Sequence, residues 1–251
     1  MIGALQSACT AACRWLVTAG VLMLAGLAVG DAKAQDQAQD PAAKGSTYFD
    51  DFDRNDLGDK YSIIDPDPNR LTLSGGKLVI VGTNPRKNIV LLKDSIPGDF
   101  VATVMVSMEV GQNNFVGLRY HIDQKNYLVV GIAGGTEIKQ VFTEKYLSGV
   151  SNRRQPFFLK AINEEVNLIA PYLSELGDRR LEGFSPNVEN WYFQMRREGA
   201  RYTGLVSTDG VHWARIGSHV MVQPYGQLGF TVGSGGGIEN GAEFDTFSVQ
   251  Q

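Results

Sequence analysis

Cysteine is nearly absent from the 251-residue chain, and the two that occur, Cys9 and Cys13, lie close to its start. Histidine is scarce as well: the three histidines form no His-x-x-x-His pair, so the sequence indicates no transition-metal site. Long basic runs are also missing, and the net charge is −4. Because a protein that follows a phosphate backbone needs a basic stripe, we expect no nucleic-acid partner.

The longest apolar run is too short to span a membrane. It extends from Trp15 to Val29, whereas a transmembrane helix needs about 20 apolar residues. Ala32 and Ala34 then give the small-x-small pattern of a signal-peptidase site. We therefore predict that residues 1–34 are a signal peptide and that the mature protein is periplasmic or secreted, with no membrane attachment after cleavage. An uncleaved anchor is the alternative. Both cysteines lie in the removed segment, so no disulfide is expected.

The rest of the chain has the pattern of an all-β protein. Residues 35–47 are polar and predict a flexible leader, and residues 48–251 predict one domain. Turn signals recur at short intervals between runs of strand length, and apolar residues alternate along 100–110. This pattern predicts an antiparallel β-sandwich of the jelly-roll kind. In residues 163–185 a helix-like spacing is interrupted by Pro171, so we expect a short helical or irregular insertion there.

No group of residues has the spacing of a known catalytic site. Sandwich-fold glucanases carry their carboxylates along one strand as Glu-x-Asp-x-(x)-Glu, and here Glu243 and Asp245 lack the third member. Ser207, Asp209 and His212 surround one tight turn, which does not orient a base between a nucleophile and an acid. We therefore expect no catalytic residues.

The sequence contains better candidates for a metal site built from oxygen ligands than for a transition-metal site. Asp51 lies near the start of the predicted sandwich and Asp245 near its end, and terminal strands of sandwiches often pair. The two carboxylates would then converge, and a structural calcium ion would relieve their repulsion. Solvent-facing turn carboxylates are the alternative.

Several stretches of the chain together resemble a known module. They are FDDFDRNDLGDKYSIIDPDPNRLTLSGGKLVI (49–80), NNFVGLRYHIDQKNYLVVGI (113–132), WYFQMRREGARYTGLVSTDGVHWARIG (191–217), GQLGFTVGSG (226–235) and AEFDTFSV (242–249). In this order they are similar to the concanavalin A-like (laminin G-like) β-sandwich module that is appended to β-xylosidase-type glycoside hydrolases. The resemblance covers most of residues 48–250 and implies a glycan-facing module, usually without catalytic residues of its own.

The resemblance also assigns a structural role to the hairpin 199–217. Its YxxxxSxDGxxW pattern is a structural signature of such modules, and it implies that Trp213 packs on the sandwich. Tyr202 and Val206 share one face of the first strand, and Asp209 and Gly210 form the turn. We therefore expect Trp213 to be buried over Tyr202 and Val206.

Strand alternation suggests where a ligand would bind. If Leu118 and the residues at 191, 193 and 195 face the core, the intervening side chains face outward. These outward residues are Arg119, His121, Tyr192, Gln194 and Arg196. Planar donors beside an aromatic ring suit sugar hydroxyls and ring faces. An ordinary solvated sheet face is the alternative.

We therefore predict an exported, non-catalytic carbohydrate-binding β-sandwich protein whose partner is a poly- or oligosaccharide. Two alternatives stay open. One is a periplasmic glycan hydrolase or lyase with acid and base residues on loops, and the other is a structural module of a cell-surface assembly.

Overall fold

The computed structural model describes residues 46–83, 87–108, 114–134, 155–171, 176, 190–223, 225–234 and 241–251. All of them belong to one compact unit, residues 38–251. The predicted signal peptide and most of the predicted leader lie outside the described residues. Within the described ranges, no helix is long and apolar enough to cross a membrane.

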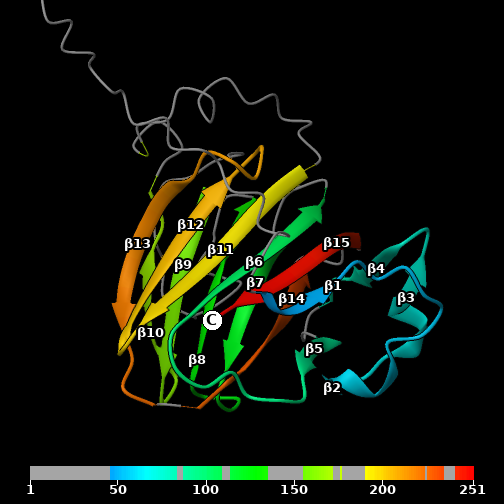
Figure 1. The fold of residues 1–251 in the computed structure, drawn as a ribbon, viewed down its shortest axis with the longest axis horizontal. Coiled ribbons are helices and arrows are strands. Elements are labelled where there is room, and N and C mark those ends of the chain that lie inside the picture. The colour runs from blue at the N-terminus through cyan, green and yellow to red at the C-terminus, as the bar shows by residue number, and fades with distance from the viewer. Residues whose placement is uncertain are drawn as a thin grey trace, which may run out of the picture. The chain divides into compact units, whose positions relative to one another are not determined.

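The described chain folds into two antiparallel sheets, as predicted, and the strands of one cross in front of the other in Figure 1. Sheet A has eight strands. Its order is β13 (Ala214–Val220), β12 (Arg201–Ser207), β11 (Asn190–Glu198), β6 (Phe100–Ser107), β15 (Gly241–Gln250), β4 (Lys77–Val81) and β3 (Leu71–Ser74), and β1 (Ser46–Asp50) also pairs with β15.

Sheet B has seven strands. Its order is β10 (Glu165–Ile169), β9 (Gln155–Ile162), β8 (Tyr127–Gly134), β7 (Asn114–His121), β14 (Gln227–Ser234), β5 (Ile89–Leu92) and β2 (Tyr61–Ile64). Two single turns of 3-10 helix, η1 (Gly58–Lys60) and η2 (Pro68–Arg70), precede β2 and β3.

Apolar residues at alternate positions build the core between the sheets. On β6 the alternating residues from Phe100 to Val106 are buried, as the period of two predicts. Trp191, Phe193 and Met195 of β11 are completely buried in the same cluster as Leu118 of β7. The core therefore lies between the inner faces of β11 and β7, which belong to different sheets.

Sheet B is also covered on its other face. Every residue of β7 and β8 is buried, so these strands show no solvent-facing side. A second apolar cluster includes Phe115, Val129, Phe157 and Leu159, which alternate with residues of the main core. Strands buried on both faces are typical of a sheet with cover on each side.

The segment 163–185 differs from the prediction in its first part. Glu165–Ile169 is strand β10, which pairs antiparallel with β9 through a two-residue turn at Asn163 and Glu164. Both turn residues have positive φ, as a tight hairpin turn requires. The proposed helix after Pro171 lies largely outside the described residues.

The hairpin 199–217 forms as predicted from β12 and β13, but Trp213 is not buried in it. Tyr202 and Val206 are completely buried, whereas Trp213 is half-buried and belongs to neither core cluster. Trp191 of β11 is the tryptophan of the core. The expectation for Trp213 was wrong because the core beside Val206 is filled by Ala214, the next residue.

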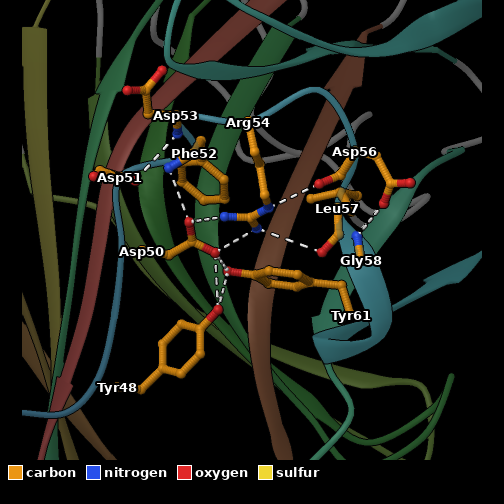
Figure 2. Close-up of polar contacts among 10 residues, drawn as sticks. All are labelled: Tyr48, Asp50, Asp51, Phe52, Asp53, Arg54, Asp56, Leu57, Gly58 and Tyr61. Carbon is orange, nitrogen blue, oxygen red and sulfur yellow. Dashed lines mark hydrogen bonds and ion pairs between the residues drawn. The ribbon is translucent and has the colours of Figure 1, made fainter.

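A buried carboxylate anchors the first strand (Figure 2). Asp50, at the end of β1, is 4% exposed and accepts two bonds from the Arg54 guanidinium, at 2.5 and 2.7 Å. Its oxygens also accept the Phe52 amide at 2.9 Å and the hydroxyls of Tyr61 and Tyr48 at 2.8 and 2.9 Å. Burial raises the pKa of Asp50, but these donors outweigh burial and lower the pKa to about 2.

Candidate functional site

The outward side of sheet A carries the polar and aromatic side chains that could meet a ligand. We call this side the outer face; it comprises the side chains of β1, β15, β6, β11, β12 and β13 that point away from the core. Residues that pair across successive strands form rows on this face. One row consists of Phe49, Ser248, Thr103, Gln194, Leu205 and Arg215. The neighbouring row contains Met105, Tyr192 and Ser207.

Tyr192 lies in the middle of the outer face and is half-buried. Its ring lies against Gly210 in the β12–β13 turn, where an added Cβ would be 3.1 Å from a ring carbon. Burial raises the pKa of Tyr192, and the carboxylates of Asp245 and Asp209 raise it further. An aromatic ring between two carboxylates offers a stacking surface flanked by acceptors for hydroxyl groups.

A β-bulge places Asp245 on this face. Phe244 and Phe247 of β15 are both buried, although they are three residues apart, and the pairing with β6 shifts between them. Asp245 and Thr246 are therefore both half-exposed.

Polar side chains form a hydrogen-bonded row next to Tyr192. Arg196 donates from Nε to Gln194 Oε1 at 2.6 Å, and Gln194 donates from Nε2 to Thr103 Oγ1 at 3.0 Å. Gln194 is buried, whereas Arg196 is exposed. Of these three residues, Arg196 is therefore the one best placed to meet a ligand, and Gln194 positions it.

Phe49 belongs to the same face and was missed by the sequence analysis. The residue is 49% exposed, and it lies opposite Ser248 on β15. Tyr48 and Asp50, its neighbours on β1, point inward to Tyr61. The alternation of Tyr48, Phe49 and Asp50 is the signal that could have placed the Phe49 ring outside.

The β12–β13 turn has the hydrogen bonds of a structural loop. Asp209 Oδ1 accepts the Ser207 hydroxyl at 3.0 Å and the amides of Val211 and His212 at 2.9 and 2.8 Å, while Oδ2 lies 2.8 Å from His212 Nδ1. Burial raises the pKa of Asp209, but the His212 amide and ring and the Val211 amide outweigh it, so the pKa is lowered. The carboxylate stands between the hydroxyl and the imidazole, so this is not the geometry of a catalytic triad.

The five predicted ligand-binding residues do not share one face. Tyr192, Gln194 and Arg196 lie on the outer face of sheet A, but Arg119 and His121 lie on β7 of sheet B. There they point away from the common core, to the opposite side of the sandwich, and they are buried at 2% and 6% exposure. The prediction of a shared face was wrong because alternation distinguishes the two sides of a strand, but not the sheet to which it belongs.

Arg119 and His121 instead form part of the covered side of sheet B. The Arg119 guanidinium lies 3.8 Å from the centre of the Tyr127 ring and donates from Nε to His121 Nδ1 at 3.2 Å. Burial, and then the charge of Arg119, lower the pKa of His121 to about 4. His121 is therefore neutral at ordinary pH and accepts the guanidinium bond.

The predicted calcium ligands come from two neighbouring strands of sheet A, Asp245 within β15 and Asp51 directly after β1. β1 and β15 are antiparallel neighbours, as expected, and Asp51 directly follows the pair between Asp50 and Phe247. Asp51 Oδ1 accepts the Asp53 amide at 3.1 Å. In the part of the chain that the structure describes, no group of three or more His, Cys, Asp or Glu side chains could hold a metal ion. Calcium binding through Asp51 and Asp245 stays a prediction.

Comparison with solved structures establishes the fold. The GH43 BlXynB protein of Bacillus licheniformis is 14% identical, covers 81% of this chain and 39% of its own, and has a TM-score of 0.62. A xylan beta-1,4-xylosidase from Bacillus halodurans is 13% identical, covers 81% of this chain and 39% of its own, with a TM-score of 0.62. The chain thus corresponds to less than half of each of these proteins.

A shorter protein matches over nearly its whole length. The Bacillus licheniformis beta-glucanase is 11% identical and covers 83% of this chain and 99% of its own, with a TM-score of 0.55. No family model matches the chain, and no curated protein matches it in sequence. At these identities the likeness shows a shared β-sandwich fold.

Proposed function

We propose that the protein is an exported, non-catalytic, concanavalin A-like module that binds a poly- or oligosaccharide on the outer face of sheet A. The observation that carries the proposal is the pair of rings on this face, Tyr192 and Phe49. Sugar rings stack on aromatic side chains, and the polar groups beside the rings suit hydroxyls.

The spacing of the two rings favours a chain of sugars over a single one. Phe49 is on β1 and Tyr192 on β11, with β15 and β6 between them. Three strand spacings amount to about 14 Å. One sugar ring cannot touch both side chains, so the ligand is an oligosaccharide that runs across the strands.

The solved structures support a carbohydrate ligand in a general way, because the similar proteins carry names such as xylan beta-1,4-xylosidase and beta-glucanase. The same names keep a hydrolase as the second candidate. Glu243 and Asp245 are the acidic pair that such an activity would need, but Glu243 is 2.7 Å from Lys77 Nζ in an ion pair. Because this ion pair engages one of the two carboxylates, the arrangement favours binding over hydrolysis.

Binding to a glycan array, followed by titration calorimetry and a reducing-end assay on each hit, tests the proposal. Tyr192→Ala and Phe49→Ala should each weaken binding by about tenfold, a loss typical of an aromatic anchor. Tyr225→Ala is the matched control, because Tyr225 is 67% exposed but lies between β13 and β14. Release of reducing ends would establish the hydrolase, and full binding by both variants would move the site away from the outer face.

The calcium prediction is tested separately. If Asp51 and Asp245 hold the ion, calcium binds only the folded state and should raise the melting temperature by several degrees at saturating concentration. Identical melting curves with calcium and with chelator would contradict it.

A further inference from the structure

Three arginines gather at one end of the outer face. Arg196 on β11, Arg201 on β12 and Arg215 on β13 come from three adjacent strands and are all exposed. Arg196 is opposite Thr203, and Arg201 is two residues from Thr203 on the same side of β12. Diagonal neighbours of this kind lie about 7–8 Å apart, within reach of long side chains. We call these three residues the arginine patch.

Two hydroxyl groups lie among the three guanidiniums. Thr203 Oγ1 and Ser218 Oγ are 2.8 Å apart across β12 and β13, and Arg215 donates from Nη2 to Ser218 Oγ at 2.9 Å. Arg196 donates to Gln194 through Nε. The contacts of Arg196 and Arg215 are therefore with neutral groups.

The charge of the patch is only partly balanced, because three guanidiniums stand with one carboxylate, that of Glu198, at this part of the outer face. Among the described residues, no carboxylate lies within 4.0 Å of the nitrogens of Arg196, Arg201 or Arg215 in an ion pair. Glu198 is the nearest acidic residue by register, opposite Arg201, and it is exposed. Two other acidic side chains of the outer face, Asp209 and Asp245, lie near Tyr192.

The charge of the outer face therefore changes along β11, from the carboxylates near Tyr192 to the arginine patch. Tyr192 and Arg196 are four residues apart on β11, which amounts to about 13 Å along the strand. Arg215 of the patch also lies at the end of the row that begins with Phe49. A glycan that contacts the aromatic rings would present its next sugars to the guanidiniums.

We propose that the glycan is acidic and that the arginine patch binds its carboxylate or sulfate groups. This inference rests on the proposed function and names the ligand class. The guanidinium fork matches the paired oxygens of a carboxylate or sulfate, and it remains charged at any physiological pH. The hydroxyls of Thr203 and Ser218 provide neutral donors between the forks.

Matched pairs of polymers test the proposal with the mature chain. Polygalacturonate is compared with its carboxyl-reduced form, and dextran sulfate is compared with dextran. The charged member of at least one pair should bind about tenfold more tightly than its neutral partner, and the pair that shows the difference identifies carboxylate or sulfate. The difference should shrink as salt is raised.

Variants locate the effect. Arg201→Gln and Arg215→Gln should each weaken binding of the charged polymer by about tenfold, and leave binding of the neutral one and the unfolding midpoint unchanged. Arg196→Gln should weaken binding of both polymers, and binding of the charged one more. Lys93→Gln removes the same charge from an exposed site between β5 and β6, and should change nothing.

The outcomes separate the inference from the proposed function. Equal affinity for charged and neutral polymers, with loss of both in Tyr192→Ala, would overturn the acidic ligand and leave glycan binding in place. An equal loss in Lys93→Gln would overturn the arginine patch in favour of a general charge effect. No binding to any glycan on the array or to these polymers would overturn both proposals.

Discussion

Asp50 is a buried charge with an unusually full set of donors. Five hydrogen bonds from Arg54, Phe52, Tyr61 and Tyr48 converge on its two oxygens (Figure 2). Replacing it by asparagine removes the acceptor charge and leaves Arg54 without its ion pair. We expect Asp50→Asn to destabilise the fold by about 2–3 kcal/mol in urea unfolding.

A control variant and the pH dependence of stability both test this role of Asp50. Measured with a chelator present, Asp51→Asn changes an exposed carboxylate next to it and should stay within about 0.5 kcal/mol. Because the pKa of Asp50 is lowered to about 2, its contribution is complete above the ordinary carboxyl pKa and is lost as the pH falls toward 2. Equal stability of Asp50→Asn and the wild type at pH 7 would contradict this account.

Gly210 links the hairpin turn to the Tyr192 ring. Its φ is +73°, and an added Cβ would lie 3.1 Å from a carbon of that ring. Gly210→Ala should therefore cost about 1–3 kcal/mol and also weaken glycan binding, because the ring must move. Gly199→Ala separates strain from contact: its φ is +58°, but nothing lies within 4 Å of the added Cβ. If both variants bind glycan equally well, the turn does not position Tyr192.

At the scale of a strand, the two tryptophans next to the hairpin should behave differently. Trp191 on β11 is completely buried in the main core, whereas Trp213 before β13 is half-buried and outside it. Trp191→Ala should cost about 3–5 kcal/mol of unfolding free energy, and Trp213→Ala clearly less. Urea denaturation of the two variants measures this difference, and a larger loss for Trp213→Ala would reverse the assignment.

Strand periodicity predicted the inner faces of individual strands correctly. Tyr202 and Val206 on β12 are buried as expected, and so are Phe193 and Met195 on β11. The bulge in β15 was not predicted, because it breaks the period of two between Phe244 and Phe247. Alternation is local, so it describes a strand well and fails where one residue is inserted.

The candidate site was only partly predictable for a different reason. Tyr192 and Arg196 were found because β11 alternates regularly, but Arg119 was assigned to the same face although β7 belongs to sheet B. The arginine patch was also missed, because Arg201 and Arg215 join Arg196 only through the pairing of β11, β12 and β13. Long-range pairing is set by the whole fold and leaves no mark in a short window of sequence.

For the molecule as a whole, two buried histidines predict loss of stability in mild acid. Burial, and then Arg119, lower the pKa of His121 to about 4. Burial also lowers the pKa of His219, whose Nε2 lies 3.0 Å from the Phe158 carbonyl oxygen, and nearby Lys160 lowers it further. The unfolded chain therefore binds more protons than the folded one as the pH falls below about 6.5.

Stability is complete above pH 6.5 and decreases as the pH falls toward 4, so the urea midpoint should drop over this window. His219→Gln should reduce the slope, because glutamine can still donate to the Phe158 carbonyl but does not titrate. A midpoint that is constant from pH 7 to pH 4.5 would contradict the prediction.

The pairing of β15 also sets the order in which the molecule can be built during synthesis. β15 joins β6, β4 and β1, so the middle of sheet A is absent until residues 241–250 have left the ribosome. The partners β1 and β4 are made long before, and they must wait without a neighbour on that side. Until then, the edges of β1, β4 and β6 that pair with β15 stay open, and an open strand edge is where a second copy of the chain can pair instead.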